Sequence, residues 1–221
     1  MYLSRFRFNT ARRGARQLLS TPQAMHAAVL SGFADPTGHT RDGQRTLWRV
    51  DQADHDTLLY IVSPGQPDLT HLEEQAGWPS TPTWVTRPYA GLLNSLSAGQ
   101  AWAFRLTANP VRDGRPKDPT VPTQRFGHVT VAQQTQWLLD RTERCGFTIS
   151  KNADGVPDVI VHARTQRAFT RRAGQSPVTL ATATYDGILE VIDADALRHT
   201  MIAGLGHAKA YGCGLLTLAP L

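Results

Sequence analysis

The spacing of apolar residues over the first ninety positions constrains the fold of this 221-residue chain more than any other feature. In residues 2–9 (YLSRFRFN), Phe6 and Phe8 lie on one side and Arg5 and Arg7 on the other, and this period of two predicts a half-buried strand. The expected elements of this half are a strand at 2–9, a loop with Arg12, Arg13 and Arg16, a helix from the Thr21-Pro22 start to about 33, strands at 46–50 and 57–62, a helix at 68–76 and a strand at 84–93. The order β-α-β-β-α-β is that of a ferredoxin-like domain.

A small, polar segment at 95–100 (SLSAGQ) predicts a linker, and a second series of elements in the same order follows it. The expected elements are a strand at 101–108, a long loop at 111–127, a helix from Thr130 to about Cys145, strands at 147–150 and 159–162, a long strand within 179–192, a helix at 194–203 and a strand at 215–218. A basic hairpin between about Val159 and Arg172 is inserted in this half. We therefore expect an α+β protein of two tandem ferredoxin-like domains, residues 1–96 and 97–221, a number that fits the chain length.

Positive charge is segregated along the chain. The net charge of +5 is made of balances of +6 over residues 1–50, −5 over 51–100, +6 over 101–180 and −2 over 181–221. Of the 23 basic residues 20 are arginine, whose planar guanidinium binds phosphate and stacks on unpaired bases. A GC-rich genome also raises the arginine count, but it does not separate the charges. The two basic segments therefore favour RNA as a partner.

The sequence also indicates the cellular location of the protein. No apolar run is long enough to cross a bilayer, and the first residues lack the apolar stretch of a secretory signal. Cys145 and Cys213 are far apart and fit no metal-ligand spacing, so we expect reduced thiols, a cytoplasmic protein and no membrane partner. The acidic cluster Asp51, Asp54 and Asp56 beside His55 is a weak metal candidate on an apparent turn, and we expect neither a metal nor an organic cofactor.

The last eighteen residues (GLGHAKAYGCGLLTLAPL) contain one charged side chain, Lys209, among four glycines. Glycine allows positive φ and a close approach of backbone N–H groups to an anion. The positions expected to contact an RNA backbone here are Gly204, Gly206, Lys209 and Gly212. A tight connection between a helix and the final strand is the alternative interpretation of the same residues.

A second basic segment lies in the inserted hairpin. It contains Arg164, Arg167, Arg171 and Arg172, with Phe169 among them. Alternate residues of a strand share a face, so Arg167, Phe169 and Arg171 are expected to point together and to follow RNA phosphates or cover a splayed base. The alternative is a solvated edge hairpin whose charges prevent pairing with other chains.

His26 is the candidate catalytic residue. Cleavage of RNA by attack of a ribose 2′-OH requires one proton to be removed and another to be supplied to the departing 5′-oxygen, and a group with a pKa near 7 can do either. His26 lies beside Met25, at the border of the apolar stripe of the first expected helix, where it can face a groove. The alternative is an ordinary surface or border histidine.

Three segments together resemble the CasE family of CRISPR repeat-processing endoribonucleases, in the RAMP superfamily. They are MYLSR at the N-terminus, FRLTANP at 104–110 and the glycine-rich C-terminus, and the resemblance extends over nearly the whole chain but is weak between about 50 and 95. It implies tandem ferredoxin-like domains, metal-independent cleavage of stem-loop repeats of precursor CRISPR RNA, and assembly with other subunits of a type I-E effector complex (Cascade) that serves antiviral defense.

The resemblance also implies roles for residues. Thr21–Ala27 (TPQAMHA) is similar to the family segment that holds the catalytic histidine, and His26 takes that position. The family tyrosine three residues earlier is Gln23 here, which can bind a phosphate oxygen but cannot act as a phenolic acid; Tyr2 or Tyr211 is a possible replacement. Basic residues at and after FRLTANP are expected to face RNA: Arg105, Arg112 and Arg115. Apart from the resemblance, Arg12 and Arg13 flank the catalytic helix and are candidate RNA contacts, with solvated loop charge as the alternative interpretation.

Two other functions fit the same residues. One is a non-catalytic subunit that binds the RNA hairpin, which the absence of the tyrosine at Gln23 favours. The other is a ferredoxin-like protein-interaction domain whose arginines reflect genome composition alone. Steep salt dependence of RNA binding would distinguish the first from the second.

Overall fold

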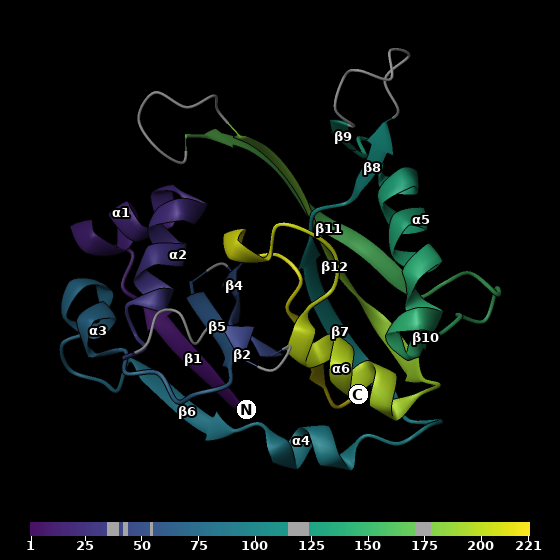
Figure 1. The fold of residues 1–221 in the computed structure, drawn as a ribbon, viewed down its shortest axis with the longest axis horizontal. Coiled ribbons are helices and arrows are strands. Elements are labelled where there is room, and N and C mark those ends of the chain that lie inside the picture. The colour runs from purple at the N-terminus through teal and green to yellow at the C-terminus, as the bar shows by residue number, and fades with distance from the viewer. Residues whose placement is uncertain (35–39, 42–43, 54, 115–123, 171–177) are drawn as a thin grey trace. The chain divides into compact units, whose positions relative to one another are not determined.

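The computed structural model describes residues 1–34, 40–41, 44–53, 55–114, 124–170 and 178–221 (Figure 1). Its contacts divide the chain into two compact units, Met1–Leu96 with Arg198–Leu215, and Ser97–Leu197 with Leu216–Leu221. We expected all of residues 97–221 in the second unit, whereas residues 198–215 belong to the first. The reason is that Arg198 donates hydrogen bonds to the carbonyls of Leu93 (2.7 Å) and Leu96 (2.6 Å), and the segment that follows packs on other elements of the first unit.

The first unit is a ferredoxin-like β-α-β-β-α-β domain. Its elements are β1 (Tyr2–Phe8), α1 (Arg13–Ser20), α2 (Pro22–Leu30), β2 (Thr40–Arg41), β3 (Gln44–Arg45), β4 (Leu47–Gln52), β5 (Thr57–Ser63), α3 (Thr70–Ala76), β6 (Trp84–Pro88), α4 (Ala90–Ser95) and the 3-10 helix η2 (Lys209–Tyr211). The sheet has the order β4-β5-β1-β6, and every neighbouring pair is antiparallel. The helices pack on one face of this sheet, where Phe6 and Phe8 of β1 join Leu18 of α1, Met25 of α2 and Leu72 of α3 in one buried cluster.

The second unit repeats the same order with two additions. Its elements are β7 (Ala101–Ala108), β8 (Val111–Gly114), β9 (Gln124–Gly127), α5 (Val131–Thr142), the 3-10 helix η1 (Glu143–Cys145), β10 (Phe147–Ile149), β11 (Val159–Phe169), β12 (Val178–Val191), α6 (Ala194–Ala203), in which the boundary between the units falls, and β13 (Leu216–Ala219). The sheet order is β10-β12-β7-β13. Tyr185 of β12 anchors α5 to this sheet, because its ring stacks on Trp137 and its hydroxyl donates to the Gln134 carbonyl (2.9 Å).

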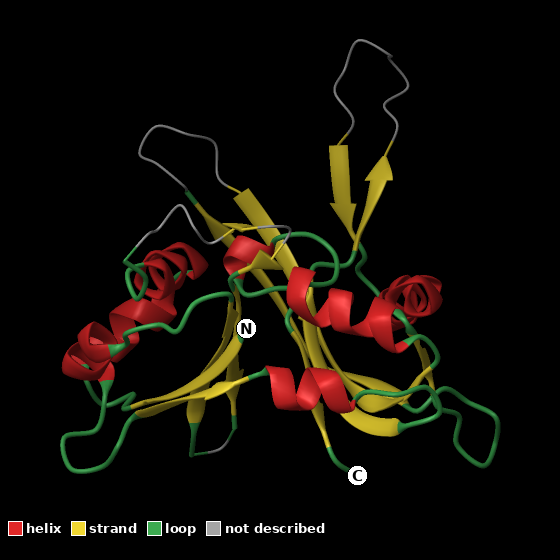
Figure 2. Cartoon of the chain, turned by 60° about the horizontal axis from the view of Figure 1, so that its bottom comes forward, coloured by secondary structure: helices red, strands yellow, loops and turns green. Residues whose placement is uncertain are grey.

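The structure differs from the expected elements at four places. The expected loop with Arg13 and Arg16 contains α1, which buries Ala15 and Leu18, and α4 follows β6 where we expected the strand to continue. The expected loop at 111–127 contains the β8–β9 hairpin. The inserted basic segment is one long strand, β11, that pairs with residues 178–187 of β12 and so belongs to the main sheet of its unit, whose strands are yellow in Figure 2. None of the helices in the described ranges is long and apolar enough to span a membrane.

Candidate active site and nucleic-acid interface

Helix α2 presents His26 at the edge of the core of the first unit. The helix begins as expected, with Pro22 in its first turn and the Thr21 hydroxyl accepting a hydrogen bond from the Ala24 N–H (3.1 Å). Met25 is buried, whereas Gln23 and His26, one turn apart, are half-buried, and the Nδ1 atom of His26 lies below the surface. The imidazole therefore lies at the border that the sequence predicts, and its ring remains partly accessible.

The glycine-rich segment folds back onto this helix. The 3-10 helix η2, which carries Lys209 and Tyr211, packs against both α2 and β4 (Figure 1). The turns that bring it there have positive φ at five positions, Gly204 (78°), Gly206 (80°), Ala208 (58°), Gly212 (81°) and Gly214 (89°). Ala208 is the only non-glycine residue with positive φ in the described part of the chain, and it lies directly before η2. Such a strained position often marks a functional segment.

Two of the glycines make close contacts within the protein. A Cβ atom at Gly212 would lie 2.7 Å from Cζ3 of Trp48, and one at Gly204 would lie 2.7 Å from Cδ2 of Leu47. Gly212 is buried, so its place in the loop is set by packing on β4. Space left by the glycines is filled by Lys209, whose Cε lies 3.2 Å from the Cβ position of Gly204 and whose Cγ lies 3.3 Å from that of Gly214.

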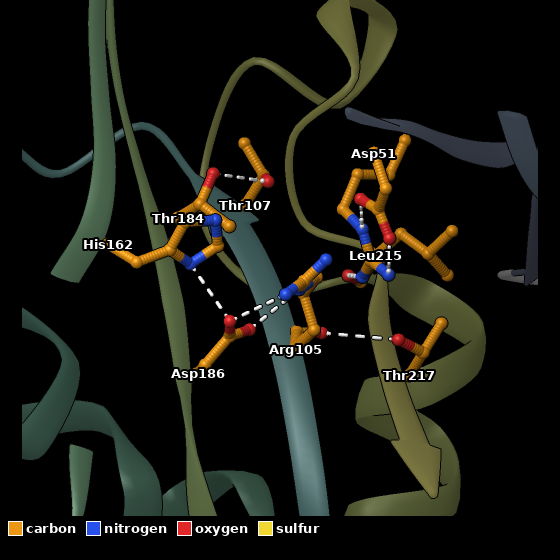
Figure 3. A network of polar contacts seen from close by, with 9 residues as sticks. Asp51, Arg105, Thr107, His162, Thr184, Asp186, Leu215 and Thr217 are labelled. Atoms are coloured by element: carbon orange, nitrogen blue, oxygen red, sulfur yellow. Dashed lines mark hydrogen bonds and ion pairs between the residues drawn. The ribbon is translucent and has the colours of Figure 1, made fainter. Parts of the chain in front are cut away.

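A buried arginine holds the far end of this segment. Arg49 of β4 is 2% exposed, and its guanidinium donates to both carboxylate oxygens of Asp51 (2.6 and 2.9 Å) and to the Leu215 carbonyl (3.0 Å), as Figure 3 shows. The carboxylate compensates the buried charge, which makes the arrangement tolerable in the interior. Asp51, part of the weak metal candidate, is thus an ion-pair partner, and no group of three potential metal ligands occurs among the described residues.

The sequence-predicted arginines near α2 differ in their availability. The guanidinium of Arg12 donates to the carbonyls of Gly77 (3.1 Å) and Glu74 (2.6 Å), at the C-terminal end of α3, and is therefore already occupied. Arg13 is exposed and has no hydrogen-bond partner in the described ranges. Of the two, Arg13 is the one that could take up a phosphate without breaking a contact.

Arg105 in the second unit is also already paired. Its Nε and Nη2 atoms donate to the two carboxylate oxygens of Asp186 (2.7 and 2.6 Å), and the His162 Nδ1 atom lies 2.9 Å from the same carboxylate (Figure 3). Beside this group the hydroxyls of Thr107 and Thr184 are 2.8 Å apart. The group brings together β7, β11 and β12. The sequence gives no signal for Asp186 or His162, because their partnership depends on strand register.

The basic strand β11 exposes its arginines but not its aromatic residue. Arg167 is exposed without a hydrogen-bond partner in the described part, and Arg164 donates to the Val129 carbonyl (3.2 Å). Phe169 is only 8% exposed, so the expectation that it covers a base together with Arg167 is wrong. Arg115, Arg171 and Arg172 lie outside the described residues.

The β8–β9 hairpin adds an aromatic residue that the sequence did not single out. The Arg112 guanidinium lies 5.9 Å from the ring centroid of Phe126, which is 47% exposed. The pKa of nearby His128 is lowered, first by burial and then by the positive charges of Arg112 and Arg141. The base of this hairpin is therefore a region of positive potential.

Comparison with known proteins extends over the whole chain. A family model described as "CRISPR associated protein" matches residues 1–220. The CRISPR-associated endoribonuclease Cse3 of Thermus thermophilus is 28% identical over 227 residues, with 100% of both chains covered, and the CRISPR system Cascade subunit CasE of Escherichia coli is 31% identical over 187 residues, which cover 79% of this chain and 89% of the relative. The structure of Thermus thermophilus Cse3 bound to an RNA representing a pre-cleavage complex has a TM-score of 0.81, with 27% identity, 99% of this chain and 98% of the other.

Proposed function

The chain belongs to the family of CRISPR-associated proteins and is an endoribonuclease of that family, and we propose that it cuts the stem-loop repeats of precursor CRISPR RNA without a metal ion. Each cut at the base of a stem would release one guide RNA. The similarity to an endoribonuclease over the full length of both chains supports this proposal, as does the tandem ferredoxin-like fold shared with an RNA-bound relative.

One observation carries the proposal. The 3-10 helix η2, with the ammonium of Lys209 and the phenol of Tyr211, packs against the helix whose half-buried face bears His26. An imidazole is thus held next to a basic, glycine-rich loop. This combination suits a site where a phosphodiester is bound and protons are moved, and two elements far apart in the sequence create it.

The chemistry follows from the phosphodiester itself. A base removes the proton of the ribose 2′-OH, the 2′-oxygen attacks the adjacent phosphorus, and the bond from phosphorus to the 5′-oxygen breaks as that oxygen takes up a proton. The products are a 2′,3′-cyclic phosphate and a 5′-hydroxyl. His26 carries one of these two proton transfers. Lys209 offsets the charge on the non-bridging oxygens, and the Gln23 amide, one turn before His26, donates to one of them.

Each unit has arginines that can bind RNA phosphates. Arg13 beside α2 and Arg167 on β11 have exposed guanidinium groups, and Arg112 and Arg164 lie at the base of the β8–β9 hairpin. We infer that after cleavage the protein keeps its product and joins a multisubunit effector complex; the Escherichia coli relative is named as a subunit of Cascade. Its place of work is the cytoplasm, where CRISPR transcripts are made.

Cleavage of a cognate repeat hairpin in EDTA tests this function. The wild-type protein should cut under single-turnover conditions, and His26→Ala should bind the hairpin equally well but cut at least about 100-fold more slowly, since general acid–base catalysis contributes about 10²–10⁴-fold. His55→Ala, which removes an exposed histidine from a loop, is the matched control and should cut normally. Equal rates for the wild type and His26→Ala would refute the catalytic role of His26.

A second function, a non-catalytic subunit that binds the RNA hairpin, is favoured by Gln23, where the resemblance expects a tyrosine. The same experiment decides between them. Binding by wild-type protein with no cleavage in either EDTA or Mg²⁺ would establish the second function and exclude the first.

A further inference from the structure

The β8–β9 hairpin has two chemically different faces. Residues directly opposite each other on paired strands share a face, and the register pairs Arg112 with Phe126 and Asp113 with Arg125. On one face the Asp113 carboxylate and the Arg125 guanidinium form an ion pair (3.2 Å), which leaves little net charge. On the other face a guanidinium lies over an exposed ring. All four of these side chains are exposed, and Figure 1 shows the hairpin projecting from the rest of its unit.

The Arg112–Phe126 face is the unusual one. Among the large hydrophobic residues that are exposed in the described ranges, Phe126 is the only aromatic, with 47% of its surface accessible. Exposure of an apolar ring to water does not stabilise the folded protein. The Arg112 guanidinium, 5.9 Å from the ring centroid, makes a cation–π contact with the ring but leaves the ring exposed. Ring and guanidinium together offer flat surfaces of the kind on which nucleobases stack.

The charges around this face favour an anionic ligand. Arg112 and Arg141 both lower the pKa of His128, behind burial as the main cause, while Asp140 acts in the opposite direction. Arg164 reaches the same place from β11 through its hydrogen bond to the Val129 carbonyl. Asp113 is compensated by Arg125. Arginines therefore outnumber carboxylates in the hairpin and the segment that follows it, and this excess of positive charge suits a nucleotide with its phosphates better than an ordinary apolar protein contact.

We propose that the Arg112–Phe126 face is a stacking platform for one unpaired nucleotide of the bound RNA. The base stacks on the Phe126 ring, and the guanidinium groups of Arg112 and Arg164 bind the flanking phosphates. A paired base presents only its edges, so the ligand is a nucleotide outside the stem. The proposal rests on the proposed function, because that function supplies the RNA ligand. It does not depend on the catalytic role of His26, because the platform positions RNA and takes no part in proton transfer.

Fluorescence of 2-aminopurine, which is quenched by stacking, tests the platform. A repeat hairpin is made uncleavable with 2′-deoxyribose at the cut position mapped for the wild type, and 2-aminopurine replaces each unpaired base in turn. Wild-type protein should quench one position. Phe126→Leu keeps an apolar side chain but removes the ring, so it should abolish that quenching and weaken RNA binding about tenfold, whereas Phe126→Tyr should retain both.

The control is Val129→Ala, which trims another exposed apolar residue (76% accessible) near Arg164 and should change neither signal. Identical fluorescence at every unpaired position for the wild type and Phe126→Leu would overturn the proposal, and so would unchanged affinity. If Phe126→Leu impairs a protein partner and leaves RNA binding intact, the face is a protein interface and the proposal is wrong. Cleavage by His26→Ala at the wild-type rate would refute the catalytic role of His26, but it would not affect the fluorescence test of the stacking platform.

Discussion

Replacing Gly212 with alanine should destabilise the protein through a single ring contact. At φ of 81° an alanine costs about 1–2 kcal/mol in the backbone alone. Its Cβ would also lie 2.7 Å from Cζ3 and 3.1 Å from Cη2 of Trp48, a ring only 4% exposed, and such overpacking costs about 1–3 kcal/mol more. We expect the free energy of unfolding in urea to fall by about 2–5 kcal/mol. Single-turnover cleavage should slow as well, because the clash with Trp48 of β4 shifts η2 and so changes its placement against α2.

Two variants isolate the ring contact from the backbone effect. Gly99 has a similar φ of 83°, and a Cβ atom there would meet nothing within 4 Å. Gly99→Ala should therefore lower the free energy of unfolding only by the backbone part, about 1–2 kcal/mol. In a Trp48→Leu background, the additional loss from Gly212→Ala should shrink to the same amount, giving a coupling of about 1–3 kcal/mol in the double-mutant cycle. If the two substitutions prove additive, the ring does not constrain the loop and the reasoning fails.

Two further predictions use other parts of the chain. Thr21→Ala removes the side chain that accepts the Ala24 N–H and should lower the free energy of unfolding by about 1 kcal/mol in urea, with Thr21→Ser restoring most of it; equal midpoints for all three proteins would contradict the capping role. Burial raises the pKa of Cys213 from 9.0 to about 12, so the folded protein keeps this thiol protonated while the unfolded chain ionises it. Stability should therefore fall as the pH rises above about 9, by up to about 1.4 kcal/mol per pH unit from this group, and the Cys213→Ala curve should lack that part; parallel curves for the two proteins would refute it.

Elements whose faces differ in burial were predictable from the sequence. The strand at 101–108 and the helix at 194–203 lie where the apolar spacing predicts them, and β1 buries Phe6 and Phe8 while exposing Arg5 and Arg7. In each case the spacing of the apolar residues reflects contact of one face with a core. The ferredoxin-like order followed from these elements, because the apolar spacing of a strand has a period of two and that of a helix a period of about 3.6.

The elements that the sequence analysis did not predict lack such a spacing of apolar residues. Helix α1 follows Arg12, which makes no side-chain cap hydrogen bond, so a start signal is absent, and its apolar face contains only two buried residues, Ala15 and Leu18. The β8–β9 hairpin is four residues per strand and exposes Arg112, Asp113 and Phe126, so no alternation between apolar and polar residues develops. Pairing between backbones, rather than burial of side chains, defines these strands.

For the candidate site, the sequence predicted where a residue lies on its helix or strand, but it did not predict the hydrogen-bond partners of that residue. The start of α2 at Thr21 placed His26 on its border face, as the structure has it. The partner of Arg105 could not be found in this way, since Asp186 is 81 residues away and faces it only through the register of β7 with β12. The partners of Arg12 could not be predicted for a related reason, because the carbonyls it binds become available only where α3 ends beside it.

The glycine-rich segment shows why a motif does not by itself assign roles to its residues. Glycine is compatible with close approach to a phosphate and equally with close approach to a neighbouring side chain, and Gly204 and Gly212 approach Leu47 and Trp48. Their absent Cβ atoms let η2 rest on β4 and α2 together, so the distance from Lys209 to the His26 helix is set by packing beneath the loop. Cleavage should consequently be sensitive to the volume of the side chains at positions 47 and 48, which act on the chemistry through the placement of η2.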